Sequence, residues 1–480
     1  MAKPMQIIEC QHLAWRAGFG ASFRDLEQWS KKDRKEVVHH LLNKPSAIRN
    51  LEVIDSASIP DYKRFKDMSA EERKQVRKLN VNGIKDLNTG WIKEMAATDH
   101  PFQEKMAVFW HGHFACRTQN VLFNQQLLQV IRSHATGNFG DLLIAVSKTP
   151  AMLAFLNNQQ NRKQHPNENF AREVMELFTM GRGNYSETDV KEAARAFTGW
   201  GFNAMGEFAF RARAHDEGKK TILGKTGFYK GDDVLAILLD QPATAKFIAR
   251  KIYKEFVNEE VDENHVNEIA GVFYKSNYDI KSMMRHIFTA DWFYDEKNIG
   301  AQIKSPVDLL IGLRRSIPMQ FEDEAVMLLF QRVMGQLLFY PPNVAGWPGG
   351  KSWIDSSSLM FRMRVPQIIL YAQAVNVAPK ELTPEMGEGN NYKMTLQLNR
   401  ALQRQYAKKV QADIDWASYI KQFEEVPRTE LSTAIAKTLI GLHYNKDLPL
   451  LEKYADESTR EQYIKTFSLG IMSTPLYQLC

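Results

Sequence analysis

The stretch HPNENFAREVMELFTMGRGN, residues 165–184, shows most clearly how this chain folds. Asn167 is a suitable N-terminal cap for a helix, and Gly181 is the kind of residue on which helices often end. The apolar residues between them recur with the period of a helix. They form one side of it: Phe170, Val174, Leu177 and Phe178. The spacing therefore predicts a helix with one buried side between Asn167 and Gly181.

The charged residues of the same stretch form a second side of that helix. Glu168, Arg172 and Glu176 follow one another at intervals of four residues, and Glu173 lies between the two sides. One interpretation is a surface helix with i,i+4 ion pairs, each worth about 0.2–0.5 kcal/mol. The other is the wall of a cleft, where Arg172 orients carboxylates for acid–base chemistry or metal binding. Spacing alone favours the surface helix.

A second helix follows after a tight turn. SETD at residues 186–189 is the pattern of a capping box, and it begins the predicted helix DVKEAARAFTGW, residues 189–200. Gly181 and Gly183 suit a turn with left-handed backbone, from which Arg182 stands out. A single Gly-x-Gly is a weak signal for phosphate binding. The pattern therefore favours a plain turn between two helices.

Helical spacing continues through most of the chain, for example over residues 23–42, 232–240 and 243–257. The exception is GEFAFRARAHDEGKKTILGKTGFYKG, residues 206–231, where phenylalanines alternate with small or polar residues and glycines interrupt the run. This pattern is typical of a short β-hairpin or ribbon. We therefore predict a mainly α protein, a large multi-helical single-body fold with a β-ribbon inserted near residues 206–231.

Composition divides the chain into three parts. Residues 1–380 contain most of the helical patterns and form the predicted main helical domain. Residues 381–427 are polar and are predicted to form a surface excursion or linker. Residues 428–480 are apolar enough for a C-terminal helical pair that docks on the main domain.

The charge balance gives no strong preference for a polyanion. The 480 residues include 62 Lys+Arg and 56 Asp+Glu, a formal charge of +6, which is small for a protein surface of this size. Nucleic acid is therefore not favoured as a partner. We interpret the basic cluster EERKQVRK, residues 71–78, as a solvated helix face, because charges of both signs recur there at helical spacing.

Three cysteines are too few for a disulfide framework. The N-terminal residues lack the apolar run of a secretion signal, and no stretch of the sequence is apolar enough to span a membrane. We therefore expect a protein without a membrane span that is cytoplasmic as written, or periplasmic if a signal has been removed.

Two histidines, His111 and His113, lie among aromatic residues in FWHGHFAC, residues 109–116. On a strand, two imidazoles at i and i+2 share one face and could bind one metal ion, whereas on a helix they point apart. Gly112 between them weakens a helix. A metal-binding or catalytic pair and two ordinary hydrogen-bonded histidines are equally supported by this pattern.

Two further motifs contain histidine beside a charged residue. His215 and Asp216 lie in ARAHDEGKK, where they could supply an imidazole and a carboxylate to the same place. His12 and Arg16 lie one helical turn apart in HLAWRAGFG. Each motif alone is a weak indication of a site.

The segment FYPPNVAGWPGGKSW, residues 339–353, predicts a loop that is stiffened by prolines and crowded with glycines. Asn343, Trp347 and Trp353 are its polar and aromatic candidates. The tryptophans could stack on a sugar or a base, or they could support the loop. Support is the favoured interpretation.

Familiar catalytic signatures are absent from the sequence. It contains no phosphate loop, no dinucleotide-binding fingerprint, no HExxH, no GxSxG and no CxxC in a usable context. Serine, cysteine and nucleotide chemistry are therefore not favoured, and we expect no nucleotide cofactor. A divalent metal ion is the cofactor that the histidines suggest.

Several separate motifs together resemble the domain of unknown function 1800 family, an uncharacterised bacterial family. They are HLAWRAGFG, FWHGHF, NENFAREVMELFTMGRGNYSETDVKEAARAFTGW, HDEGKKTILG, IKSPVDLL, PPNVAGWPGG and the closing STPLYQ. Apart from the closing motif they span Gln11 to Trp353. A match of this length does not arise from helical patterning alone.

The resemblance implies no established activity. Genes of this family often lie beside those of the domain of unknown function 1501 family, which resembles sulfatases and alkaline phosphatases, so the resemblance implies a partner of that kind. Many members carry an export signal, which this chain lacks as written. The residues of the match are mainly polar and suggest a shared site. They include His111, His113, Glu168, Asn169, Arg172, Glu173, Glu176, Arg195, His215, Asp216, Asn343 and Trp347.

Our leading hypothesis from the sequence is a metal-assisted or acid–base enzyme, of hydrolytic type, that acts on a glycan or another polymer. The predicted catalytic residues are Glu168, Arg172, Glu173, Glu176 and Asp216. The predicted metal ligands are His111, His113 and His215. The predicted substrate-binding residues are Arg182, Asn343 and Trp347. Two alternatives stay open: a non-catalytic scaffold or assembly protein held by ion-pair networks, and a module that binds carbohydrate or nucleic acid.

Overall fold

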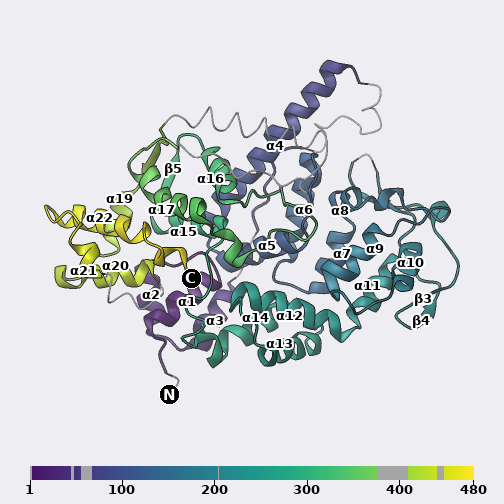
Figure 1. Ribbon diagram of the computed structural model, residues 1–480, viewed down its shortest axis with the longest axis horizontal. Helices are drawn as coiled ribbons and strands as arrows, with labels where there is room; N and C mark the ends of the chain where they lie inside the picture. The colour runs from purple at the N-terminus through teal and green to yellow at the C-terminus, as the bar shows by residue number, and fades with distance from the viewer. Residues whose placement is uncertain (1–2, 45–47, 56–67, 204, 376–408, 441–447) are drawn as a thin grey trace.

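Over its described residues the protein consists mainly of α-helices, with short two-stranded sheets, as the computed structural model shows (Figure 1). The structure describes the whole chain except residues 1–2, 45–47, 56–67, 204, 376–408 and 441–447. Among the described residues, the buried apolar side chains form one continuous core that runs from Met5 to Tyr477. The predicted fold class, mainly α with a small β insertion, is therefore confirmed.

The described residues up to Phe155 form eight α-helices. They are α1 (Ile7–Arg16), α2 (Phe23–Trp29), α3 (Arg34–Asn43), α4 (Ala70–Ala97), α5 (Pro101–His113), α6 (Val121–His134), α7 (Phe139–Ser147) and α8 (Pro150–Phe155). Side-chain caps begin several of them: Ser22 and Ser69 each form a capping box with an acidic residue three positions later.

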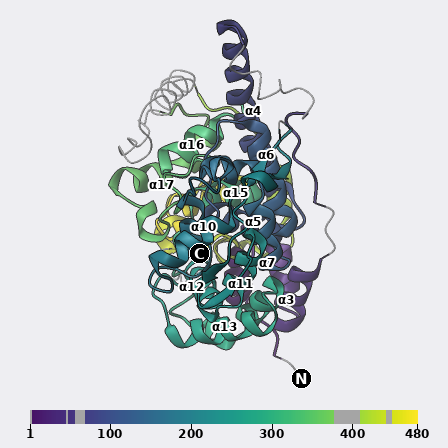
Figure 2. The same ribbon diagram turned by 90° about the vertical axis from the view of Figure 1, so that its right-hand side faces the viewer.

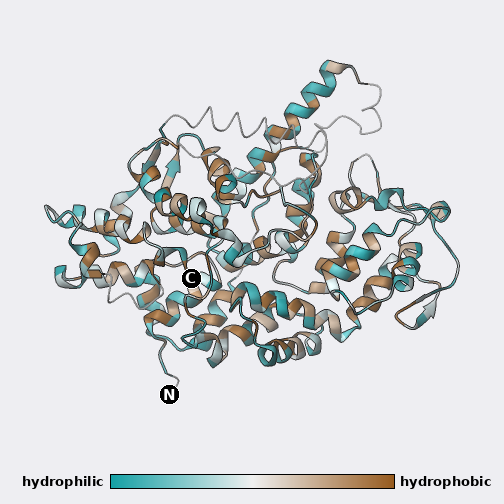
Figure 3. Cartoon of the chain, viewed as in Figure 1, coloured by the Kyte–Doolittle hydropathy of each residue, from teal (hydrophilic) through white to brown (hydrophobic). Residues whose placement is uncertain are grey.

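Helix α4 projects from the body of the molecule in both views (Figures 1 and 2). Its buried side chains all lie from Gly83 onward, where the helix packs against α6 and α15. Residues 71–78 are exposed or only partly buried, and the projecting end is mostly hydrophilic (Figure 3). The basic cluster is therefore a solvated helix face, as its mixed charges predicted.

The charged stretch at residues 165–184 forms α9 (Asn169–Glu173), which continues as a π-helical turn, η4 (Val174–Thr179). In this turn the backbone N–H of Met180 bonds to the carbonyl of Met175, and the Thr179 hydroxyl donates to the carbonyl of Val174. A π-turn is wider than an α-turn, so later residues rotate away from the α-helical projection. Met175 is consequently buried and Leu177 only partly buried, which corrects the predicted apolar side.

Helix α10 (Glu187–Ala196) begins at the predicted capping box, where Ser186 and Asp189 bond reciprocally. The predicted ribbon near residues 206–231 is instead two hairpins. The first pairs β1 (Trp200–Phe202) with β2 (Phe208–Phe210), and the second pairs β3 (Lys220–Ile222) with β4 (Lys225–Gly227). The first hairpin thus begins six residues before the predicted boundary, because its first strand starts at Trp200, soon after α10 ends at Ala196.

The second half of the chain adds further helices and one more strand pair. The helices up to residue 370 are α11 (Gly231–Leu239), α12 (Pro242–Phe256), α13 (Glu263–Lys275), α14 (Ile280–Thr289), α15 (Pro306–Ser316), α16 (Val326–Met334) and α17 (Ser356–Leu370). Those after it are α19 (Trp416–Lys421), α20 (Leu431–Leu439), α21 (Leu448–Glu452) and α22 (Arg460–Met472). Strand β5 (Met319–Phe321) pairs antiparallel with β6 (Ala412–Ile414).

Most of the predicted polar excursion, residues 381–408, lies outside the described residues. Its described end returns to the body of the molecule through the β5–β6 pair. The C-terminal helices α20 and α22 pack against each other, α20 also contacts α1 and α2, and α22 contacts α17. The division into three domains stays a prediction. Within the part of the chain that the structure covers, every helix is too short or too polar to cross a bilayer.

Candidate functional site

His111 and His113 lie at the end of α5, on a helix, so their side chains point apart. The His111 ring packs against Trp91, Phe339 and Trp347, with ring centroids 5.3, 5.0 and 5.8 Å away. Its Nε2 accepts a hydrogen bond from the Phe339 backbone N–H at 3.2 Å. Burial lowers the pKa of His111 to about 4. This neutral imidazole holds the backbone of Phe339, a residue with φ of 68°.

His113 faces a different neighbourhood. Its Nε2 lies 3.2 Å from the backbone carbonyl of Phe178, which can only accept, so Nε2 carries the proton. Nδ1 is then an acceptor and lies 3.1 Å from the ammonium of Lys251. Burial, together with the charge of Lys251, holds the pKa of His113 well below its usual value. His113 is therefore a neutral imidazole that orients Lys251.

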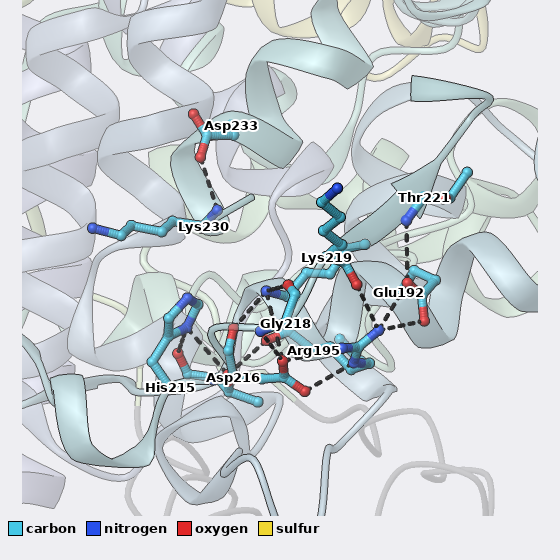
Figure 4. A network of polar contacts seen from close by, with 12 residues as sticks. Glu192, Arg195, His215, Asp216, Gly218, Lys219, Thr221, Lys230 and Asp233 are labelled. Carbon is cyan, nitrogen blue, oxygen red and sulfur yellow. Dashed lines mark hydrogen bonds and ion pairs between the residues drawn. The ribbon is translucent and has the colours of Figure 1, made fainter. Parts of the chain in front are cut away.

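His215 and Asp216 belong to a network that ties the second hairpin to α10 (Figure 4). Arg195 donates to both carboxylate oxygens of Asp216 at 2.8 and 3.0 Å and to Glu192 at 2.9 Å. The hydrogen bonds from Arg195 are the largest reason that the pKa of Asp216 is lowered. His215 Nδ1 donates to the backbone carbonyl of Thr198 at 3.0 Å. These groups are satisfied by one another, as in a structural anchor.

The Glu168–Arg172–Glu176 stripe lies at the surface. Arg172 pairs with Glu168 at 3.1 Å, as the spacing predicted, but its stronger partner is Glu187 on α10, bonded twice at 2.7 Å. Glu176 accepts from Arg182 and from the Tyr185 hydroxyl instead of pairing with Arg172. The Arg182 side chain is 86% exposed. The π-turn explains the change of partner, because it rotates Glu176 relative to Arg172.

Glu173 is the member of this helix that least resembles a plain surface residue. It is only partly exposed, and burial, with a smaller contribution from Glu176, raises its pKa. Like the rest of the stripe, it does not line the cavity described below. The predicted catalytic residues thus lie outside this cavity and apart from the buried histidines.

The three predicted metal ligands do not fit one metal ion. His111, His113 and His215 have separate neighbours, and each uses at least one ring nitrogen in a hydrogen bond within the protein. Over the described ranges of the chain, no group of three or more His, Cys, Asp or Glu side chains could hold a metal ion. The divergence follows from the helix, which turns positions i and i+2 to different sides.

A polar cavity of about 350 Å³ lies between α5, α12, α15 and the loop at residues 339–353, which we call the Pro/Gly loop. We call this cavity the α5–α12 cavity. Two of the predicted residues, His113 and Trp347, line it. The cations of its lining are Arg16, Lys105, Lys251 and Lys254. The acidic side chains of its lining are Glu255, Glu259 and Asp308, and Cys480 adds negative charge near Arg16 and Lys105.

An enclosed ion pair forms one wall of the α5–α12 cavity. The Lys105 ammonium lies 2.6 Å from the Asp308 carboxylate, and the two residues are only 6% and 5% exposed. Burial acts to lower the pKa of Lys105, but the attraction of Asp308 and other nearby negative charge outweighs it, so the pKa is raised. Asp308 also accepts from the backbone N–H of Ser305, which begins α15 with a capping box.

Arg16 is 2% exposed and lacks partners for part of its guanidinium. Its Nη2 donates to the backbone carbonyl of Asn298 at 3.0 Å. Nε and Nη1 are buried and have no acceptor among the residues that the structure describes. An arginine stays charged in a protein, and a buried unsatisfied donor costs about 1–3 kcal/mol. Arg16 is therefore poised for an acceptor that the described chain does not supply.

Lys251 and Glu255 lie one turn apart on α12, and both line the α5–α12 cavity. Burial lowers the pKa of Lys251 to about 8. The Glu255 side chain is exposed along the cavity, and the cavity walls desolvate its carboxylate, which raises its pKa; Lys105 opposes this rise, and Asp308 adds to it. The α12 face thus presents two titratable groups whose pKa values have moved toward neutrality.

The Pro/Gly loop closes the cavity against the end of α5. At Gly346, with φ of 82°, a β-carbon would overlap the carbonyl oxygen of Gly112, so the two backbones touch. At Gly350 a β-carbon would lie 2.7 Å from the Glu259 carboxylate. Trp353 is buried, which supports the loop as predicted, while Trp347 is only partly buried. Asn343 is exposed and accepts from the backbone N–H of Ala345, so it shapes the loop outside the cavity.

Comparison with known families identifies the chain. The model of the family described as Protein of unknown function (DUF1800) matches residues 12–479. The chain belongs to this family. No curated protein and no solved structure matches it. The family description names no activity, so the function of this DUF1800 protein has to be argued from its site.

Five residues of the site were not assigned a role from the sequence: Arg16, Lys105, Lys251, Glu255 and Asp308. Two of them stand in DUF1800 motifs, HLAWRAGFG and IKSPVDLL, and that membership was the available signal. Lys251 and Glu255 lie in a helix that reads as an ordinary amphipathic one. Their i,i+4 spacing is that of a common surface ion pair, so nothing local marked them.

Proposed function

We propose that this DUF1800 protein is an acid–base enzyme whose active site is the α5–α12 cavity. One observation carries the proposal: Lys251 and Glu255 face the same cavity from one side of α12, and their pKa values are moved toward each other. Opposed shifts of this kind are a common mark of paired catalytic acids and bases. We assign the general base to Glu255 and the general acid to Lys251.

The assignment follows from the protonation states between the two pKa values. Glu255 is ionised there and accepts a proton, while Lys251 is an ammonium and donates one. His113, fixed as the Nε2 tautomer by the Phe178 carbonyl, accepts from Lys251 and is a positioning residue. Hydrolysis of a glycan, the reaction expected from the sequence, uses a positioned base and acid of this type.

The proposal leaves no step to a metal ion, because the predicted histidine ligands do not share a site. It also moves the catalytic role away from Glu168, Arg172, Glu173, Glu176 and Asp216. The partner of the domain of unknown function 1501 family and the cellular compartment stay predictions from the resemblance and the sequence.

The pH dependence of turnover tests the proposal. Purified protein is incubated with a panel of neutral and acidic polysaccharides and chromogenic esters, and kcat/KM is measured from pH 4 to pH 10, about the range over which both groups titrate. We expect a bell-shaped pH profile of kcat/KM whose alkaline limb lies near the pKa of Lys251, about 8. The acid limb should lie above the usual pKa of glutamate, since that of Glu255 is raised.

Substitution then assigns the two limbs. Lys251→Met should remove the alkaline limb and Glu255→Gln the acid limb, each with a large loss of rate. Full activity of both variants on a substrate that the wild type turns over would refute the proposal.

A further inference from the structure

Arg16 is the feature of the α5–α12 cavity that proton transfer leaves unexplained. It is almost completely buried, yet two of its three guanidinium nitrogens have no acceptor among the described residues. Its coulombic neighbours are Cys480, which contributes most, and then Glu255 and Asp308, but Arg16 forms no ion pair with them among the described residues. Burying donors without acceptors is unfavourable, and because Arg16 lines a cavity, a ligand there can supply the acceptor.

The free donors of Arg16 indicate the chemistry of that ligand. The lining contains cations and negative charge together, and Cys480, Glu255 and Asp308 all contribute negative charge near Arg16. The Lys105–Asp308 pair is already closed at 2.6 Å, which leaves Arg16 as the buried cation with free donors. A planar guanidinium binds a carboxylate or a sulfate through two parallel hydrogen bonds. An oxyanion of this shape would satisfy these donors.

The tryptophans of the Pro/Gly loop indicate which class of molecule bears the anionic group. Trp347 and Trp353 line the cavity from the Pro/Gly loop, and Trp347 is partly exposed. An indole face offers a flat apolar surface whose contacts suit the C–H face of a sugar ring. A volume of about 350 Å³ is near the lower end for small-molecule sites, enough for about one or two sugar rings.

We infer that the α5–α12 cavity binds an acidic sugar, whose single carboxylate or sulfate is held by Arg16 and whose ring stacks on Trp347. The inference rests on the proposed function, because it names the substrate class of the same cavity. The two proposals depend on different residues: Arg16 and Trp347 bind the sugar, whereas Lys251 and Glu255 transfer protons.

Binding of three matched ligands tests the inference without any turnover. Oligosaccharides of equal length made of galacturonic acid, of sulfated galactose and of neutral galactose are titrated into the full chain, and Kd is measured by calorimetry. We expect at least one acidic ligand to bind about tenfold or more tightly than the neutral one. The acidic ligand that binds more tightly identifies the anion as carboxylate or sulfate. Equal affinity for all three would overturn the inference.

Variants locate the binding. Arg16→Lys keeps a positive charge but loses the planar fork, so we expect about tenfold weaker binding of the acidic ligand and little change for the neutral one. Gly112→Leu is a second variant that leaves the buried arginine untouched. A β-carbon at Gly112 meets open space beside the cavity, so a leucine there should obstruct the ligand.

Gly90→Leu is the matched control, because Gly90 lies inside helix α4, also meets open space and does not line the cavity. Acidic-sugar binding that survives both Arg16→Lys and Gly112→Leu would place the ligand elsewhere and overturn the inference. Glu255→Gln separates the two proposals. If it abolishes turnover while acidic and neutral sugars bind alike, the acid–base enzyme stands and the Arg16 subsite falls. If acidic sugar binds through Arg16 while turnover is unaffected by Glu255→Gln, the subsite stands and the catalytic assignment falls.

Discussion

Two regions of this protein are rich in charge, and they differ in how that charge is satisfied. In the region of α9, α10 and the second hairpin, cations and carboxylates pair with one another near the surface, as Arg195 does with Asp216 and Arg172 with Glu187. In the α5–α12 cavity, Arg16, Lys105 and Asp308 are enclosed, and part of the Arg16 guanidinium lacks an acceptor within the described chain. The difference teaches that charge dense along the sequence is paired within the protein here, whereas the site that we propose combines enclosed charge with unmet hydrogen bonds.

The largest effect should come from exchanging one glutamate in each region. Glu255→Gln removes the proposed general base and should reduce kcat about 10²–10⁴-fold, the usual contribution of such a group. Glu173→Gln, in the helix where the sequence analysis placed the catalytic carboxylates, should change kcat less than about twofold, because Glu173 is not the proposed base. Initial rates at saturating substrate measure both. The reverse order of effects would return the active site to the α9 helix.

The second largest effect should be a loss of stability when the backbone contact between Gly346 and Gly112, which shapes the cavity, is disturbed. Gly346→Ala would place a side chain on a backbone with φ of 82° and against the Gly112 carbonyl. We expect a loss of about 2–3 kcal/mol in the free energy of unfolding. Gly112→Ala meets open space in a helix and should instead gain about 0.5–1 kcal/mol. Urea denaturation measures the pair, and equal stability of the two variants would show that the loop does not rest on α5.

A smaller loss is expected from the paired region. Asp216→Asn removes the charge that Arg195 binds with two hydrogen bonds, so we expect about 1–2 kcal/mol lower stability. Binding of a sugar in the α5–α12 cavity should not change. Thermal unfolding and calorimetric titration of the same sample give both quantities. Unchanged stability combined with lost activity would mean that Asp216 has the catalytic role predicted from the sequence.

The smallest effect should come from the charged stripe itself. Arg172→Met removes partly exposed ion pairs with Glu168 and Glu187. Such pairs are screened by solvent, so we expect a change below about 1 kcal/mol in the free energy of unfolding and no change in kcat. A salt series separates the contribution of charge, since the difference from wild type should shrink at high ionic strength. A large loss of activity would argue that the stripe faces a substrate.

The sequence by itself determined the helical class, the family and the place of the charged motif helix. These follow from local rules that act within a few residues. The Ser186 side chain caps α10, and the Asn167 side chain accepts from the backbone N–H of Asn169, although the N-cap of α9 is Glu168, one residue after the predicted cap. The same local rules were insufficient at η4. One π-turn, stabilised by the Thr179 hydroxyl, rotated Glu176 away from Arg172 and toward Arg182 and Tyr185.

Only the tertiary structure decided which charged residues form a site. Arg16, Lys105, Lys251 and Asp308 come from four helices, and whether a group is enclosed or solvated depends on what packs around it from distant parts of the chain. The sequence could place His113 and Trp347 among the candidates, but it could not separate His113, which faces the cavity, from His111, which holds the loop. That separation follows from the helical turn of α5 and from the loop that packs against its end.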